Sequence, residues 1–294
     1  MYYRYNDINL YVEFINRNKN KNILILPGWG ETFNTFYNIS SYFKNYNIYI
    51  VHNIGFGNSK FPNRDLTIYN YAYVVKEFIK HNNINNLYVI AHSFGGRIAS
   101  ILIGKYNIKV KRLVLMDVAG FEGKSIKTKV KEIIYKVKIK LFKRKRKEIF
   151  LKYASPDYKA LNENMKNTFK NIVKENLKKY YKKIKVDTLI IWGEKDSITP
   201  IKDGKKLNKL IKNSSLISFK DGSHFTYLEY FYNVNKIIEC YFKDWPLLFS
   251  KASELSIASK SLFLWLGAFF FKFSYSCVSS KPILEYFFNS IFPS

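Results

Sequence analysis

A serine in the segment 91–95, Ala-His-Ser-Phe-Gly, has a setting that can make a hydroxyl nucleophilic. The apolar run 87–91 leads into Ser93, and an amphipathic helical pattern begins directly after it. A sharp strand-to-helix turn of this kind, a nucleophile elbow, holds the hydroxyl out above a sheet. Because the turn is tight, the positions two before and two after the serine must be small, and they are Ala91 and Gly95. Glycine is commoner at both positions, so the methyl group of Ala91 is a departure, but a single methyl usually still fits.

A serine needs a base to take its proton and an acid to orient that base. Asp196 follows an apolar strand in the segment 192–196, and His224 follows the next strand in the segment 221–225. We therefore expect Ser93 as the nucleophile, His224 as the base and Asp196 as the orienting acid. All three lie where the carboxyl ends of parallel strands would bring them to one edge of a sheet, which is where proteins with open α/β sheets build their sites.

The assignment of the acid has alternatives. Asp117, directly after the apolar run 113–116, competes with Asp196 as the acid. Asp196 could instead cap a helix that leads to Pro200. The remaining histidines are assigned to packing or to the surface; they are His52, His81 and His92.

Apolar runs alternate with helical patterns over most of the chain. Apolar residues three or four apart predict helices over 67–81, 97–106 and 203–211. Continuous apolar strands between helices favour an α/β fold with a mostly parallel central sheet flanked by helices. The expected strands are 23–26, 48–51, 87–90, 113–116, 189–192 and 216–219, with an additional edge hairpin around 8–15.

A helical insertion interrupts this alternation after the sixth strand, over residues 121–185. Residues 124–185 hold 22 Lys/Arg against 5 Asp/Glu, a net charge of +17 within a chain whose formal net charge is +27. We interpret 121–185 as a basic helical lid over a core made of 1–120 and 186–243. Its lysine-rich face would attract anionic headgroups or an acidic protein, or would simply be solvated.

The segment 26–30, Leu-Pro-Gly-Trp-Gly, follows an early strand, and together with the elbow and the acid loop it carries a resemblance. Over residues 22–242 the chain resembles the α/β-hydrolase superfamily, in particular its lid-bearing serine esterases. The resemblance implies an oxyanion hole made by the backbone amides of Trp29 and Phe94. The segment 52–59 matches a family loop but lacks that loop's aspartate, and we expect little consequence for the chemistry.

The expected reaction is hydrolysis of a carboxylic ester through an acyl-serine, with no metal and no organic cofactor. The alternatives are a methyl esterase acting on a substrate linked to an acyl carrier protein, a membrane-surface acylglycerol lipase, and a non-catalytic binding protein of the hydrolase fold. The expected partners are a small-molecule acyl ester and an acidic carrier or anionic membrane at the lid. Nucleic-acid binding has only the charge in its favour and is discounted.

The ends of the chain say less about function. The first residues are polar and aromatic, without the apolar core of a secretory signal, and Cys240 and Cys277 form no disulfide framework or metal-ligand spacing. We expect a cytoplasmic location, with a peripheral position at a membrane as the alternative. The apolar, serine-rich tail 244–294 is read as an interfacial anchor, a helix packed on the core or a non-native extension.

Overall fold

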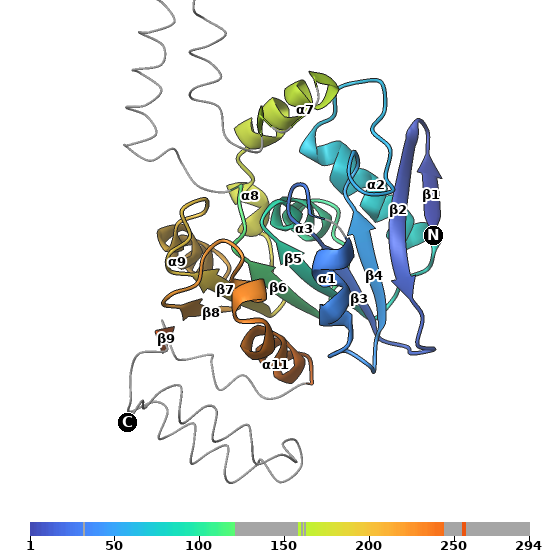
Figure 1. Cartoon of the computed structure of the whole chain (residues 1–294). Coiled ribbons are helices and arrows are strands. Elements are labelled where there is room, and N and C mark those ends of the chain that lie inside the picture. The colour runs from blue at the N-terminus through green and yellow to red at the C-terminus, as the bar shows by residue number, and fades with distance from the viewer. Residues whose placement is uncertain (32, 121–157, 160, 162, 244–254, 257–294) are drawn as a thin grey trace, which may run out of the picture. The chain divides into compact units, whose positions relative to one another are not determined.

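The structure is a computed structural model that describes residues 1–31, 33–120, 158–159, 161, 163–243 and 255–256 (Figure 1). The chain divides into two compact units, Met1–Leu255 and Ser256–Ser294. The sheet and the candidate site described below belong to the first unit. Residues 121–157 of the expected lid lie outside the described residues. So does the expected tail, apart from the two-residue strand β9 (Leu255–Ser256).

The first unit is built on a mostly parallel sheet. Its strands follow the order β1-β2-β4-β3-β5-β6-β7-β8. The first two strands form a hairpin that pairs antiparallel with β4, and every further pairing from β4 to β8 is parallel. The bounds are β1 (Tyr2–Tyr5), β2 (Ile8–Ile15), β3 (Asn22–Leu26), β4 (Asn47–His52), β5 (Leu87–His92), β6 (Arg112–Met116), β7 (Thr188–Gly193) and β8 (Ser214–Phe219).

Helices cover both faces of this sheet (Figure 1). The helices α1 and α11 pack on one face, and α2, α3, α8 and α9 pack on the other. The described helices are α1 (Phe33–Ser40), α2 (Ile68–His81), α3 (Phe94–Gly104), α7 (Glu163–Lys174), α8 (Lys178–Tyr181), α9 (Ile201–Leu210), α10 (Thr226–Glu229) and α11 (Phe231–Phe242).

The central strands are apolar throughout because both of their faces are buried. In β3, Ile23 and Ile25 belong to the cluster under α1 and α11, while Leu24 and Leu26 belong to the cluster under α2 and α3. Successive side chains of a strand point to opposite faces, so burial on both sides requires an unbroken apolar run. This is the pattern from which the sheet was expected, and the α/β fold with a mostly parallel central sheet flanked by helices is confirmed.

The described part of the expected insertion has two different surroundings. Helix α7 carries exposed polar residues along much of its length, with Met165, Thr168 and Ile172 buried. The segment around α8 packs beside α3 within the larger core cluster, where Leu177 and Tyr181 are fully buried. Among the residues that the structure describes, no helix is both long and apolar enough to cross a membrane.

Candidate active site

The expected elbow lies between β5 and α3. Ser93 has φ 45° and ψ −108°, and residues with a side chain rarely adopt such a positive φ. Such a conformation costs about 1–3 kcal/mol and persists where the surrounding structure fixes it. Here the Ser93 N–H donates to the carbonyl of Met116 at 3.0 Å, and the Ser93 carbonyl accepts from Gly96 at 3.1 Å. The serine is therefore held at the N-terminus of α3 in the strained turn that the sequence predicts.

The small residues around the elbow are required to different degrees. A Cβ at Gly95 would collide with the carbonyl oxygen of Leu26, which belongs to the backbone of the neighbouring strand β3. A Cβ at Gly96 would meet the side chain of Val118. Ala91 is fully buried in the core cluster. The elbow thus accommodates the methyl group of Ala91, while a methyl group at position 95 would have to displace backbone.

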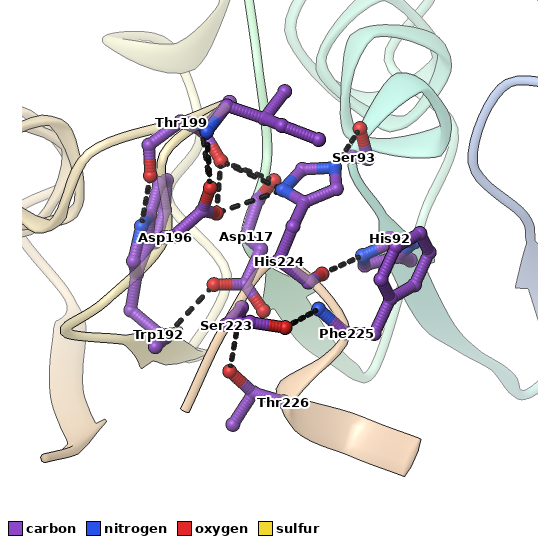
Figure 2. A network of polar contacts seen from close by, with 12 residues as sticks. His92, Ser93, Asp117, Trp192, Asp196, Thr199, Ser223, His224, Phe225 and Thr226 are labelled. Atoms are coloured by element: carbon purple, nitrogen blue, oxygen red, sulfur yellow. Dashed lines mark hydrogen bonds and ion pairs between the residues drawn. The ribbon is translucent and has the colours of Figure 1, made fainter. Parts of the chain in front are cut away.

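Three side chains from three strand ends meet above the sheet (Figure 2). Nδ1 of His224 lies 2.7 Å from Oδ2 of Asp196, and Nε2 of His224 lies 2.9 Å from Oγ of Ser93. The side chain of Asp196 is fully buried and that of His224 is 8% exposed. The structure therefore brings together the residues expected as nucleophile, base and acid, in hydrogen-bonding order.

The loop after β7 fixes the Asp196 carboxylate through more than its histidine. Oδ1 accepts from the backbone N–H groups of Ile198 at 2.7 Å and Thr199 at 2.8 Å, and Oδ2 lies 2.6 Å from Oγ1 of Thr199. Burial works against ionisation here, but the hydrogen bond and charge of His224 and the bonds from Thr199 hold the pKa of Asp196 below its usual value. Asp196 therefore closes its own turn and also contacts the histidine, so the two sequence interpretations are compatible.

Thr199 is a site residue that the sequence analysis missed. Its hydroxyl lies within 3.2 Å of Nδ1 of His224 and within 3.0 Å of the carbonyl oxygen of Asp117. The signal was present in the chain, because an Asp with a Thr three residues later favours a side-chain-closed turn. Only the fold shows that this turn also reaches the histidine.

The competing acid, Asp117, has a different set of contacts. Its Oδ1 accepts from the backbone N–H of Gly193 at 2.9 Å, which ties the end of β6 to the end of β7. Its side chain is fully buried, and this burial raises the pKa of Asp117 well above its ordinary value. A carboxyl group that favours its neutral form is a poor partner for an imidazolium. The geometry favours Asp196 as the acid.

The two residues expected to supply oxyanion amides lie on neighbouring loops. Trp29 follows β3, and Phe94 is the first residue of α3, where the helix dipole favours negative charge. Their rings touch, with centroids 5.1 Å apart. The Trp29 ring also contacts Phe56 at 5.0 Å and Phe169 of α7 at 5.3 Å. The described part of the insertion therefore reaches the aromatic cluster beside the candidate site.

Residues outside the expected set hold the loop that carries Trp29. Nδ2 of Asn53 donates to the carbonyl oxygens of Pro27 at 3.2 Å and Gly28 at 3.0 Å. The Glu31 carboxylate accepts from the N–H of Gly28. The missing aspartate of the segment 52–59 was expected to have little consequence for the chemistry, and the same segment places Asn53 directly on this loop.

His92 was assigned to packing or the surface, and it has a more specific place. Its ring is buried, with Nδ1 2.8 Å from Oε1 of Glu31 and Nε2 2.8 Å from the carbonyl oxygen of His224 (Figure 2). Burial disfavours the charged form of both residues. Their mutual attraction nonetheless raises the pKa of His92 and lowers the pKa of Glu31. The two side chains form a buried ion pair between the loop after β3 and the end of β5, and His92 extends the contact to the loop after β8 through the His224 carbonyl.

Comparisons with known proteins agree with this architecture. The family model described as the alpha/beta hydrolase fold matches residues 21–134 and 141–230. A lipase, Lipase 3 of Moraxella sp. (strain TA144), is 25% identical over 70% of this chain and 72% of its own length. The pimeloyl-[acyl-carrier protein] methyl ester esterase of Wigglesworthia glossinidia brevipalpis is 26% identical over 76% of this chain and 93% of its own.

Solved structures give the same result for the fold. An esterase from Exiguobacterium antarcticum superposes with a TM-score of 0.65 and 21% identity, covering 80% of this chain and 96% of that one. The family match spans both the elbow with Ser93 and the loops carrying Asp196 and His224. The chain belongs to the alpha/beta hydrolase fold family, and its similar relatives include lipases and esterases.

Proposed function

We propose that this chain is a serine hydrolase that cleaves a carboxylic ester through an acyl-serine intermediate. The observation that carries the proposal is the continuous contact from Asp196 through His224 to Ser93, at 2.7 Å and 2.9 Å. A serine hydroxyl becomes nucleophilic when an adjacent imidazole takes its proton and a carboxylate orients that imidazole. The esterases and lipases among the relatives support the same reaction class.

In the first half of the reaction, Oγ of Ser93 attacks the ester carbonyl carbon while its proton passes to Nε2 of His224. The carbonyl oxygen becomes an oxyanion that accepts hydrogen bonds from the amides of Trp29 and Phe94. Each such donor is typically worth about 3 kcal/mol in the transition state. His224 then gives its proton to the leaving alkoxide, and the alcohol departs from the acyl-serine.

The second half repeats these steps with water. His224 takes a proton from the water as its oxygen attacks the acyl carbon, and the same two amides accept the new oxyanion. When the intermediate collapses, the proton returns to Oγ of Ser93 and the carboxylic acid is released. Asp196 holds the Nδ1–H tautomer of His224 throughout and stabilises the imidazolium that forms twice in each cycle.

The test is covalent labelling with a fluorophosphonate probe together with hydrolysis of p-nitrophenyl esters of increasing acyl length. Wild type is expected to take up one label, and Ser93→Ala to take up none and to lose at least about 10³-fold in kcat. Ser41→Ala, a change at an exposed serine, is the matched control and should behave as wild type. An unlabelled wild type, or equal labelling of Ser93→Ala, would overturn the proposal. The chain-length series identifies the acyl group that the pocket prefers.

A second candidate is a methyl esterase whose acyl substrate is carried by an acidic protein. Two observations favour it: the Wigglesworthia relative is matched over 93% of its length, and exposed lysines follow one another from the last residue of α7 to just after α8. These lysines are Lys174, Lys178, Lys179, Lys182 and Lys183. A positive surface of this kind speeds the approach of an acidic partner and does so less at high salt.

Salt dependence on three substrates separates the candidates. Carrier-linked methyl ester hydrolysis should fall steeply in kcat/KM between low and physiological salt, while a small soluble ester should be hydrolysed at a salt-independent rate. Faster hydrolysis of esters in anionic vesicles than of the carrier-linked ester and the small soluble ester would favour a lipase at a membrane surface instead. Equal, salt-insensitive rates on all three would leave the lysines without a docking role.

A further inference from the structure

We propose that Asn53 and the buried pair Glu31–His92 are positioning residues that orient the Trp29 amide toward the oxyanion and hold its loop against the loop of His224. None of these side chains was expected to take part in the site. The proposal rests on the proposed function, because it assigns the Trp29 N–H to the oxyanion hole. It adds a set of residues that act through the backbone and touch no substrate.

The argument begins with the peptide unit between Gly28 and Trp29. The described peptide bonds are all trans, so the C=O and the N–H of one unit point in opposite directions. Asn53 donates to the Gly28 oxygen at 3.0 Å, and this bond fixes the direction of the carbonyl. The Trp29 N–H then has to point to the side away from Asn53. Asn53 thus sets the orientation of an amide to which it makes no contact.

The preceding peptide unit is held at both of its ends. Asn53 donates its second proton to the carbonyl oxygen of Pro27 at 3.2 Å, and the Gly28 N–H of that unit donates to the Glu31 carboxylate. The orientation of the Asn53 amide is unambiguous, because the reverse assignment would turn its oxygen toward two carbonyl oxygens. Two successive peptide planes are therefore oriented by two side chains.

The same carboxylate connects this loop to the catalytic base. Oε1 of Glu31 accepts from the Tyr227 hydroxyl at 3.0 Å and faces Nδ1 of His92 at 2.8 Å. The other ring nitrogen of His92 donates to the carbonyl oxygen of His224 at 2.8 Å. A displacement of Glu31 would therefore reach both the Trp29 amide and the backbone of His224.

The network is enclosed, which makes its geometry strict. Asn53 and His92 are each 1% exposed, and the Glu31 side chain is 9% exposed. A Cβ at Gly28 would lie 2.8 Å from Oε2 of Glu31 and 2.9 Å from Nδ1 of His92, so the glycine gives the pair the space it occupies. Buried polar groups that lose a partner cannot turn to water, so each contact constrains the next.

The experiment replaces Asn53 by leucine, which is similar in size but donates no proton. Because the oxyanion exists only in the transition state, we expect kcat on a p-nitrophenyl ester to fall about 10- to 100-fold with KM little changed. Asn235→Leu is the matched control. Asn235 is also fully buried, also donates Nδ2 to a backbone carbonyl, that of Phe231 at 2.7 Å, and lies on α11. The melting temperature of each variant is measured alongside.

A folded Asn53→Leu protein with wild-type kcat overturns the proposal. So does a loss of kcat that Asn235→Leu reproduces at the same loss of stability, because the effect would then be structural. If Asn53→Leu does not fold, Glu31→Gln is the second variant. The Glu31 carboxylate faces three donors, the Gly28 N–H, the Tyr227 hydroxyl and Nδ1 of His92, and the glutamine NH₂ would face at least one of them. We therefore expect kcat to fall while KM is kept. Wild-type turnover in that variant overturns the proposal equally. Failure of the proposed function would be seen separately, because the wild-type protein would then neither react with the fluorophosphonate nor hydrolyse esters.

Discussion

The two loops that flank the candidate oxyanion position are held in different ways. The elbow after β5 is fixed by backbone packed on backbone, with Gly95 against the carbonyl oxygen of Leu26. The loop after β3 is fixed by side chains, with Asn53 from the end of β4 on its carbonyls and the loop's own Glu31, paired with His92 of β5, beside Gly28. One of the two proposed amide donors is therefore set by close packing and the other by a buried polar network.

This difference indicates how each loop should respond to change. A backbone contact has no alternative arrangement, so disturbing it strains the strand and helix together. A side-chain contact can be lost without moving a strand, so disturbing the network should preserve the fold and misplace the amide. Stability and turnover should therefore separate between the two loops.

The largest effect is expected from Gly95→Ala. The new methyl group would meet the backbone of β3, which cannot move without shifting the centre of the sheet. Overpacking of this kind typically costs about 1–3 kcal/mol and more where backbone must move, so we expect a loss of about 3 kcal/mol or more. Urea denaturation measures it. A loss below about 1 kcal/mol would show that β3 and α3 separate easily, and would remove the contrast between the loops.

Gly28→Ala should have a smaller effect on stability and a clear effect on turnover. Its methyl group would meet side-chain atoms of Glu31 and His92 and no backbone, so accommodating it displaces the pair and leaves the strands in place. We expect a loss of about 1–2 kcal/mol together with a fall of roughly 10-fold or more in kcat. Denaturation and steady-state kinetics on the same preparation check both. A variant with wild-type kcat would mean that the pair does not govern the Trp29 amide.

The smallest effect is a pH dependence of stability contributed by the ion pair. The pKa of His92 is raised in the folded state, so its contribution is full below the unfolded value of about 6.5 and is lost as pH rises through the raised pKa. The pKa of Glu31 is lowered, so its contribution is full above about 4.3 and is lost as pH falls through the lowered pKa. The stability difference between wild type and the double variant E31Q/H92Q should therefore be greatest between about pH 4.3 and 6.5.

Denaturation of both proteins at pH 4, 5.5 and 8.5 measures this difference. Every other titratable group is present in both proteins, so its contribution to the difference cancels to first order. A difference that is flat across the range would mean that the pair is not charged in the folded protein, although it would leave the hydrogen bonds of the loop in place.

Much of the fold and the main side chains of the site could be predicted from the sequence because their signals are local. The apolar run before Ser93 and the small residues around it lie within a few positions of one another. Asp196 and His224 each follow a strand whose apolar residues are consecutive. In a parallel sheet such strand ends converge, so local patterns are enough to place the residues.

The supporting residues could not be predicted because their partners are distant in the chain. Asn53 contacts a loop 25 positions earlier, and His92 contacts the backbone of a residue 132 positions later. Neither residue type in its local context indicates a partner. The loop 52–59 was matched as a motif, and a motif says which turn forms but not which side chain the turn brings against its neighbour.

The N-terminal hairpin has a consequence of another kind. The strand β4 is buried at every position, and β2 hydrogen-bonds along the side of it that faces away from β3. Without residues 1–15, the sequence Asn-Ile-Tyr-Ile-Val-His would become an open edge of unpaired amides and carbonyls. Flat apolar edges of this type recruit further strands from other molecules. The hairpin therefore protects β4 from pairing with other molecules. Its outer strand β1 is four residues long and starts with the exposed Tyr2, whose ring packs against Tyr11, so it offers another chain only a short edge.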